Sequence, residues 1–225
     1  MIEIRFPDGA VRTYPKGTTS LEIAKSISEG LAKKVLAAKV NGVVWDATRP
    51  IETDATLQLL TWNDTDGKQT FWHSSAHLMA EAVESMFPGV KFWVGPAIDH
   101  GFYYDMDLGD RKMTEEDLLA LEKKMNELAK QANAYRRKAI PKAEAIAYFN
   151  EKGDEYKLDL LQNLNDGEIT FYTQGNFTDL CRGPHIHNTG FIKAIKLTNI
   201  AGAYWKGDEH NKQLQGIWHY IPQSE

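Results

Sequence analysis

The sequence contains one cysteine, Cys181, and no long apolar run. A single cysteine cannot form an internal disulfide, which suits a reducing compartment and leaves Cys181 available as a ligand, a nucleophile or a core residue. No apolar stretch approaches the roughly 20 residues needed to span a bilayer, and nothing near Met1 resembles a signal peptide. We therefore expect a cytoplasmic protein without a membrane partner.

The sequence also has no excess of basic over acidic side chains. The 26 basic and 31 acidic side chains give a formal net charge of −5, which argues against a globally basic nucleic-acid binder but permits a local basic face. A composition of 42% hydrophobic and 25% charged residues is typical of a folded globular protein. At 225 residues the chain is long enough for two modest domains, each with its own core.

The first sixty residues have the pattern of a small β-rich domain. Apolar and polar residues alternate on both sides of the turn at Asp8-Gly9, which predicts a β-hairpin. Thr19 and Glu22 have the spacing of a capping box, which predicts a short helix ending at Gly30. Three more strands, predicted at 35–40, 43–45 and 57–62, complete the order β-β-α-β-β-β. This order is that of a β-grasp domain.

The polar stretch 63–69 lacks periodicity and predicts a linker, so we place one domain at 1–62 and a second at 63–225. In the second domain, apolar periodicity predicts helices at 71–87, from Thr114 to about 135, and from Pro141 to Lys152. A short partly apolar turn is predicted at 156–161. Strands are predicted at 91–94, 101–107, 169–173, 179–187, 191–200 and 201–208. Helices and strands in this mixed order predict an α+β fold.

Two pairs of candidate ligands stand out. His73 and His77 lie four residues apart on a predicted helix, and Cys181 and His185 have the same spacing a hundred residues later. A zinc protease would need a glutamate after the first histidine, where this chain has Ser74. Each pair alone is more simply explained by core or surface residues. Together, three imidazoles and a thiolate could bind Zn²⁺ or, without metal, surround a substrate.

Several segments resemble the N-terminal half of bacterial threonyl-tRNA synthetases. They are HSSAHLMAEAV, GFYYDMDL, YKLDLL, DLCRGPHI and AGAYWKGDEHNKQLQ. The first sixty residues resemble the TGS module of that family, and the rest resembles its editing domain, which alanyl-tRNA synthetases and freestanding editing proteins share. The resemblance implies hydrolysis of Ser-tRNA(Thr), the ester made when serine is mistaken for threonine. Such editing is needed because one missing methyl changes binding by only about 1–3 kcal/mol.

The resemblance also implies roles for individual residues. His73 is expected to position or activate the attacking water, and His77 to orient the ester. Lys157 is expected to stabilise charge that develops on the carbonyl oxygen or to hold a water, although a solvated surface lysine is the simpler expectation from sequence alone. Cys181 and His185 are expected to line the pocket.

Asp179, Tyr104 and His100 are the expected substrate contacts, with Asp179 binding the α-ammonium of serine. The alanyl and freestanding relatives use the His/His/Cys/His set as zinc ligands, whereas the threonyl version is thought to use ordered waters. We expect that no cofactor is required, with Zn as the alternative. Some basic and aromatic residues could contact RNA or, alternatively, form only a solvated face and a core tryptophan. They are Arg136, Arg137, Lys138, Lys193, Lys196, Lys206, Tyr204 and Trp205.

The sequence departs from the family pattern at two places. His187 stands where the family often has proline, and the end of the chain reads GIWHYIPQSE instead of continuing into the aminoacylation domain. We expect an editing part, either excised or freestanding, whose partner is the acceptor end of tRNA(Thr) carrying serine, together with the aminoacylation domain in full-length family members. The alternatives are a non-catalytic tRNA-binding module and a zinc-dependent freestanding deacylase.

Overall fold

The computed structural model describes residues 1–98 and 101–219. The chain forms two compact units, and each is described here by itself. One consists of Met1–Phe71 with Gly183–His187, and the other of Trp72–Arg182 with Asn188–Glu225. The domain boundary after residue 62 stays a prediction, and His100 lies outside the described residues. Of the helices in those ranges, none is long and apolar enough to cross a membrane.

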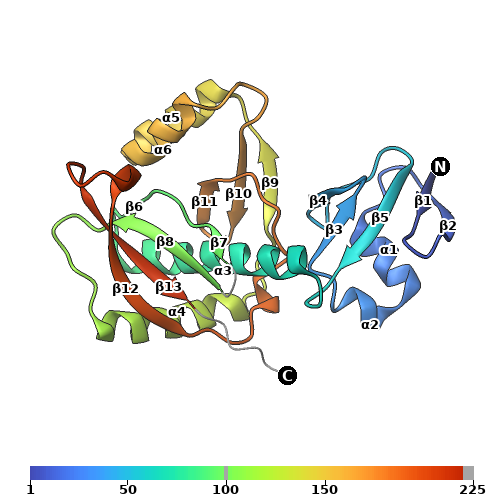
Figure 1. Ribbon diagram of the computed structural model, residues 1–225, viewed down its shortest axis with the longest axis horizontal. Helices are drawn as coiled ribbons and strands as arrows, with labels where there is room; N and C mark the ends of the chain where they lie inside the picture. Colours follow the sequence, from blue (N-terminus) through green and yellow to red (C-terminus); the bar gives the residue numbers. More distant parts are fainter. Residues whose placement is uncertain (99–100, 220–225) are drawn as a thin grey trace. The chain divides into compact units, whose positions relative to one another are not determined.

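The first unit is built on a five-stranded sheet with the strand order β2-β1-β5-β3-β4 (Figure 1). The parallel pairing of β1 with β5 joins the β1–β2 hairpin to the antiparallel strands β5, β3 and β4. This arrangement confirms the predicted β-grasp fold. The strands are β1 (Ile2–Arg5), β2 (Val11–Tyr14), β3 (Ala37–Val40), β4 (Val43–Trp45) and β5 (Ala55–Leu60). The helices are α1 (Ser20–Ile27) and α2 (Glu29–Ala32).

Local sequence explains most of this unit. Thr19 and Glu22 form the predicted capping box of α1, and Ile23 on that helix is buried with the sheet residues of a single core cluster. The prediction that Gly30 ends the helix is wrong. Ser28 takes an extended conformation after Ile27, and its side chain accepts hydrogen bonds from the first backbone N–H groups of α2, which contains Gly30. The N-cap at Ser28 therefore begins a second helix, α2.

The predicted linker at 63–69 is also wrong in part, because helix α3 (Thr65–Met86) begins inside it. At Gly67 an added Cβ would lie 2.1 Å from the backbone oxygen of Thr61, so only glycine fits this turn of the helix. Lys39 forms an ion pair with Asp66 at 2.6 Å. This part of the helix is polar because much of it faces solvent, and the sequence therefore lacks the apolar periodicity by which a helix is predicted.

The second unit contains two sheets (Figure 1). The three-stranded sheet has the order β11-β10-β9, and the other has the order β12-β13-β8-β6 with β7 paired to β8. The strands are β6 (Lys91–Phe92), β7 (Ala97–Ile98), β8 (Gly101–Asp107), β9 (Arg136–Ala139), β10 (Thr170–Gln174), β11 (Phe177–Leu180), β12 (Leu197–Tyr204) and β13 (Gln213–His219). Together with its helices, this unit confirms the α+β class.

The helices of the second unit besides α3 are α4 (Glu115–Lys130), α5 (Lys142–Lys152) and α6 (Glu155–Gln162). Thr114 and Asp117 form the predicted capping box of α4, which ends at Lys130, before the predicted end near 135. Pro141 precedes α5, and Gly153 ends it in the left-handed conformation, as predicted. The ends of α4 and α5 therefore determine where the polar segments that follow these helices begin.

Three predictions in this unit need correction. Residues 156–161 belong to helix α6 rather than to a turn, because the side chain of Asp154 accepts hydrogen bonds from the backbone N–H groups of Tyr156 and Lys157. The strand predicted at 179–187 ends at Leu180, and the chain then reaches Pro184, which has no N–H to donate to a ladder. The two strands predicted at 191–200 and 201–208 form one strand, β12, which lies between 3₁₀ turns at Thr189–Phe191 and Trp205–Gly207; strand β13 is an element without a matching prediction.

Candidate active site

His73 and His77 lie one turn apart on α3, and their rings meet edge to face with centroids 5.1 Å apart. His77 is buried at 2% exposure, whereas His73 is only partly buried. Gln174 on β10 donates a hydrogen bond of 2.9 Å from Nε2 to the backbone oxygen of His77. The helix thus offers one imidazole near solvent and one enclosed by protein.

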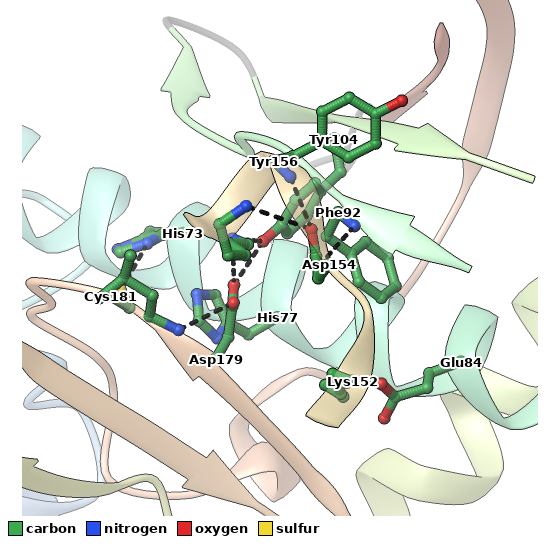
Figure 2. A network of polar contacts seen from close by, with 12 residues as sticks. His73, His77, Glu84, Phe92, Tyr104, Lys152, Asp154, Tyr156, Asp179 and Cys181 are labelled. Atoms are coloured by element: carbon green, nitrogen blue, oxygen red, sulfur yellow. Dashed lines mark hydrogen bonds and ion pairs between the residues drawn. The ribbon is translucent and has the colours of Figure 1, made fainter. Parts of the chain in front are cut away.

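Cys181 follows directly after β11 and lies beside the first histidine. Its Sγ is 3.3 Å from Nε2 of His73 (Figure 2). The backbone of Cys181 is fixed by Thr170, whose backbone oxygen accepts from the Cys181 N–H at 3.0 Å and whose hydroxyl donates to the Cys181 oxygen. The candidate ligand atoms of His73, His77, Cys181 and His185 all lie within 4.8 Å of one another. The four predicted ligands therefore form one group.

Lys157, Asp179 and Tyr104 form a buried polar cluster. Nζ of Lys157 lies 2.9 Å from Oδ2 of Asp179, and both side chains are almost fully enclosed, at 3% and 4% exposure. The hydroxyl of Tyr104 donates to the same Oδ2 at 2.6 Å, and Lys157 Nζ lies 3.3 Å from that hydroxyl. The expectation of a solvated surface lysine is therefore wrong. Helix α6 places this lysine in the interior.

The surroundings of the buried groups shift their pKa values in different directions, which determines which of them are charged. Burial, with a further contribution from His73, lowers the pKa of His77 to about 3, so this imidazole is neutral at physiological pH. Burial alone would raise the pKa of Asp179, but the Lys157 ammonium and the hydrogen bond from Tyr104 hold it below its usual value. Burial and the adjacent Asp179 carboxylate raise the pKa of Tyr104 well above its usual value. The cluster thus contains a carboxylate and a neutral phenol.

Asp154 is a residue of this region that the sequence analysis missed. Its Oδ1 accepts from the N–H groups of Tyr156 and Lys157, and its Oδ2 accepts from the N–H of Phe92 at 3.3 Å (Figure 2). It therefore fixes the first turn of α6 against β6, and with it the base of the Lys157 side chain. An aspartate two residues before the segment at 156–161 is a helix-start signal, and it is the sequence feature that indicates a helix here rather than a turn.

The predicted RNA contacts are dispersed. Arg136, Arg137 and Lys138 are exposed on the edge strand β9. Lys196 forms an ion pair with Glu122 and Lys206 with Asp159. Trp205 packs edge to face against Tyr156, and Tyr204 is 43% exposed. Lys193 is exposed as well. Lys138 also pairs with Glu144, at 3.4 Å, so β9 carries three exposed basic residues in succession of which one has an acidic partner.

The donor set of the histidine–cysteine group fits a zinc ion. Three imidazole nitrogens and one thiolate are ligands that Zn²⁺ prefers, and a neutral histidine such as His77 keeps a lone pair for a metal. Among the described residues, the group includes His185 and not His187. His187 belongs to the same Gly183–His187 segment as His185 but is not part of the group. Burial lowers the pKa of its imidazole.

Comparison with protein families identifies both parts of the chain. Residues 2–61 match the TGS domain, and residues 169–217 match the threonyl and alanyl tRNA synthetase second additional domain. The chain is therefore a two-part protein that carries a TGS domain and a synthetase-type second additional domain. These matches agree with the β-grasp sheet of the first unit and with the site residues around β11.

The similar full-length proteins indicate which kind of tRNA synthetase the chain resembles. The chain is 66% identical to a threonine–tRNA ligase of Cytophaga hutchinsonii over 97% of its own length, which is 34% of that relative. It is 57% identical to a threonine–tRNA ligase of Parabacteroides distasonis and 53% identical to one of Bacteroides fragilis, with the same coverage. The chain matches the N-terminal region of threonyl-tRNA synthetases, with its editing-type domain. It spans about a third of the length of these relatives.

Proposed function

We propose that the second unit hydrolyses the ester of mischarged Ser-tRNA(Thr). The observation that carries this proposal is the buried Lys157–Asp179–Tyr104 cluster on one side of a histidine–cysteine pair that is partly open to solvent. Charged groups are costly to bury unless they are paired, so a lysine kept in the interior is typical of a functional site. The match to the second additional domain supports the same reading.

The reaction requires one water molecule. Its oxygen forms a bond to the ester carbonyl carbon, the carbonyl carbon separates from the ribose oxygen of the terminal adenosine, and a proton moves to that leaving oxygen. His73 is the proposed base, because it is the partly exposed imidazole of the pair and its Nε2 is turned toward Cys181. His77 is neutral, and we assign it to orienting the ester by hydrogen bonding.

Lys157 is the proposed source of electrostatic stabilisation. A positive charge that is already buried and held by two neighbours needs no reorganisation when negative charge develops on the carbonyl oxygen. Asp179 is the proposed partner of the α-ammonium of serine, with Tyr104 fixing its carboxylate. Cys181 and His185 then line the pocket.

A metal offers a second way to use the same residues. His73, His77, Cys181 and His185 would hold a zinc ion. If bound there, zinc would act as a Lewis acid, and one of the four protein ligands would have to leave before a water could bind it. Because His73 can act as a base only when it is not bound to zinc, and Lys157 already supplies a positive charge, we propose that the hydrolysis requires no metal.

Selection against threonine would arise from size. Serine lacks one methyl group, and a pocket that fits the smaller side chain rejects the larger one through a steric clash, which discriminates more strongly than a missing contact does. We further propose that the natural partner is the acceptor end of tRNA(Thr) in the cytoplasm. The exposed basic strand β9 would neutralise its phosphates. An aminoacylation domain would accompany this region in a full-length enzyme.

The proposal is tested by incubating the chain with Ser-tRNA(Thr) and Thr-tRNA(Thr) and measuring the release of each amino acid. Release of serine with little release of threonine supports it. Salt-dependent tRNA binding without hydrolysis would instead identify a non-catalytic binding module. The variant His73→Ala serves to show that hydrolysis arises from this site rather than from a contaminant.

A further inference from the structure

The groups of the candidate active site come from two different elements of the second unit. His73 and His77 lie on α3, whereas Asp179 lies on β11 and Cys181 follows directly after it (Figure 2). The reaction proposed above requires these groups to keep fixed distances from one another. A contact that fixes the β10–β11 hairpin against α3 therefore determines the geometry of the site.

Glu81 lies one turn after His77 on α3 and contacts the turn between β10 and β11. Its side chain is buried, and its Oε1 accepts a hydrogen bond of 3.3 Å from the backbone N–H of Asn176. The backbone of the turn approaches this carboxyl group so closely that a Cβ added at Gly175 would lie 2.0 Å from Oε1. The turn of the hairpin thus packs directly on Glu81.

Gln174, the last residue of β10, joins Glu81 to His77. It is buried, and its Nε2 donates a hydrogen bond of 2.9 Å to the backbone oxygen of His77. Its side chain also hydrogen-bonds to the carboxyl group of Glu81. In an α-helix the backbone oxygen of His77 accepts from the N–H of Glu81, four residues later. One amide side chain of the hairpin therefore contacts both ends of this helical turn.

The surroundings of Glu81 favour its neutral form. Burial raises the pKa of the carboxyl group, although hydrogen bonds from the Asn176 backbone and the Gln174 side chain oppose the increase. A neutral carboxylic acid still has a carbonyl oxygen that can accept from the Asn176 N–H. A glutamine at position 81 would offer the same oxygen at nearly the same size, so it is a close substitute.

The hairpin carries the position of its turn to the site. Gln174 pairs with Phe177 next to the turn, and Tyr172 pairs with Asp179 two residues further along the same ladder. The ring of Phe177 also meets the His77 ring edge to face, with centroids 5.9 Å apart. Asp179 therefore keeps its place relative to His77 only while the turn stays packed on α3.

We propose that Glu81 is a positioning residue that, together with Gln174, sets the distance between the imidazoles of α3 and the groups at the end of β11. This role rests on the hydrolytic function proposed above and extends it to a residue without substrate contact. Without the Glu81 side chain, the turn loses its acceptor on α3 and the hairpin can shift along the helix. A shift of about 1 Å is enough to lower a rate by roughly a hundredfold.

The test compares Glu81→Ala with Glu81→Gln by two measurements. One is kcat and KM for serine release, and the other is the dissociation constant of Zn²⁺, whose proposed ligands come from both elements. Glu81→Ala should lower kcat by roughly tenfold to a hundredfold with KM little altered. It should also weaken zinc binding by roughly tenfold. Glu81→Gln should retain most of both properties, because it keeps the acceptor oxygen.

Glu122→Ala is the matched control. Glu122 joins α4 to the start of β12 in a similar way, by accepting a hydrogen bond of 2.8 Å from the backbone N–H of Leu197. This variant should be less stable in urea but should keep kcat and the affinity for zinc. Gln174→Met removes the second contact of the same network, and it replaces Glu81→Ala in both measurements if that variant does not fold.

The outcomes separate the positioning role from the hydrolytic function. Zinc binding weakened in Glu81→Ala and not in Glu122→Ala, with a wild-type chain that hydrolyses neither charged tRNA, would retain the positioning role and reject the hydrolytic function. Serine release by the wild type, with kcat and zinc binding unaltered in folded Glu81→Ala and Gln174→Met, would reject the positioning role alone. Equal losses of kcat and zinc affinity in Glu81→Ala and Glu122→Ala would also reject it, because they would indicate only a general effect of stability.

Discussion

The ammonium of Lys157 lies 2.9 Å from Oδ2 of Asp179, and both side chains are enclosed by protein. Removing one charge of such a pair leaves the other buried without its partner. We expect Lys157→Met to lower the free energy of unfolding by about 3–5 kcal/mol. The double variant Lys157→Met/Asp179→Leu should lose less than the sum of the two single variants, because the two sites are coupled.

Urea denaturation of the three variants measures this coupling. Lys206→Met is the matched control, because its pair with Asp159 has a similar separation of 2.7 Å but is partly exposed. The control should lose no more than about 1 kcal/mol. Equal losses in Lys157→Met and Lys206→Met would show that burial does not distinguish the two pairs.

Asp154 is expected to position Lys157 without touching the substrate. Asp154→Ala removes the cap of α6 and leaves the N–H of Phe92 without its carboxylate acceptor, so we expect a loss of about 1–3 kcal/mol in stability. The kcat for serine release should fall with it, and Asp154→Asn should restore part of both. Thr114→Ala removes the cap of α4 as a control. If both alanine variants lowered kcat equally, Asp154 would have only a general structural role.

Stability should depend on pH through Asp105. Burial raises the pKa of this carboxyl from its ordinary value of 3.8 to about 6. Between these values the folded state holds a proton that the unfolded state releases, so Asp105 makes the protein less stable as pH rises from about 4 to 6. Asp105→Asn should therefore gain stability relative to the wild type across this window, by on the order of 3 kcal/mol above pH 7. Urea unfolding at pH 4, 5, 6 and 7.5 tests this, and a difference that did not grow with pH would contradict it.

Metal binding and hydrolysis should be separable. The histidine–cysteine group should bind Zn²⁺ in equilibrium dialysis, and Cys181→Ser should weaken that binding, because a hydroxyl is a poorer zinc ligand than a thiolate. Serine release should persist after treatment with a chelator, since Lys157 supplies the positive charge and His73 can act as a base when no zinc is bound. Activity that disappeared with the chelator and returned with zinc would assign the reaction to the metal instead.

Much of the fold could be predicted from local signals. The capping boxes at Thr19 and Thr114 and the left-handed glycine at Gly153 each act over a few residues, so the sequence reveals them directly. The first turns of α3 were predicted as a linker because their polar residues carry no apolar period. Strand β13 was missed for another reason. It pairs with the neighbouring β12 as well as with the distant β8, but its residues, QLQGIWH, do not alternate regularly between apolar and polar, so its sequence carries no strand signal.

In the candidate site, too, some residues could be predicted from the sequence and others could not. The four candidate ligands could be grouped from their spacing and from family resemblance, and the structure brings them together. The burial of Lys157 could not be predicted, because it depends on where α6 packs and on Asp179 from a distant strand. The capping role of Asp154 has a local sequence signal, but its contact with Phe92, 62 residues away, has none. Long-range packing decides these positions.

The release of amino acid from the two charged tRNAs tests the central claim most directly. The chain, incubated with Ser-tRNA(Thr) or Thr-tRNA(Thr), should release serine much faster than threonine, and a Lys157→Ala variant that remains folded should lose most of that activity. Equal release from both tRNAs, or no release from either, would contradict the account.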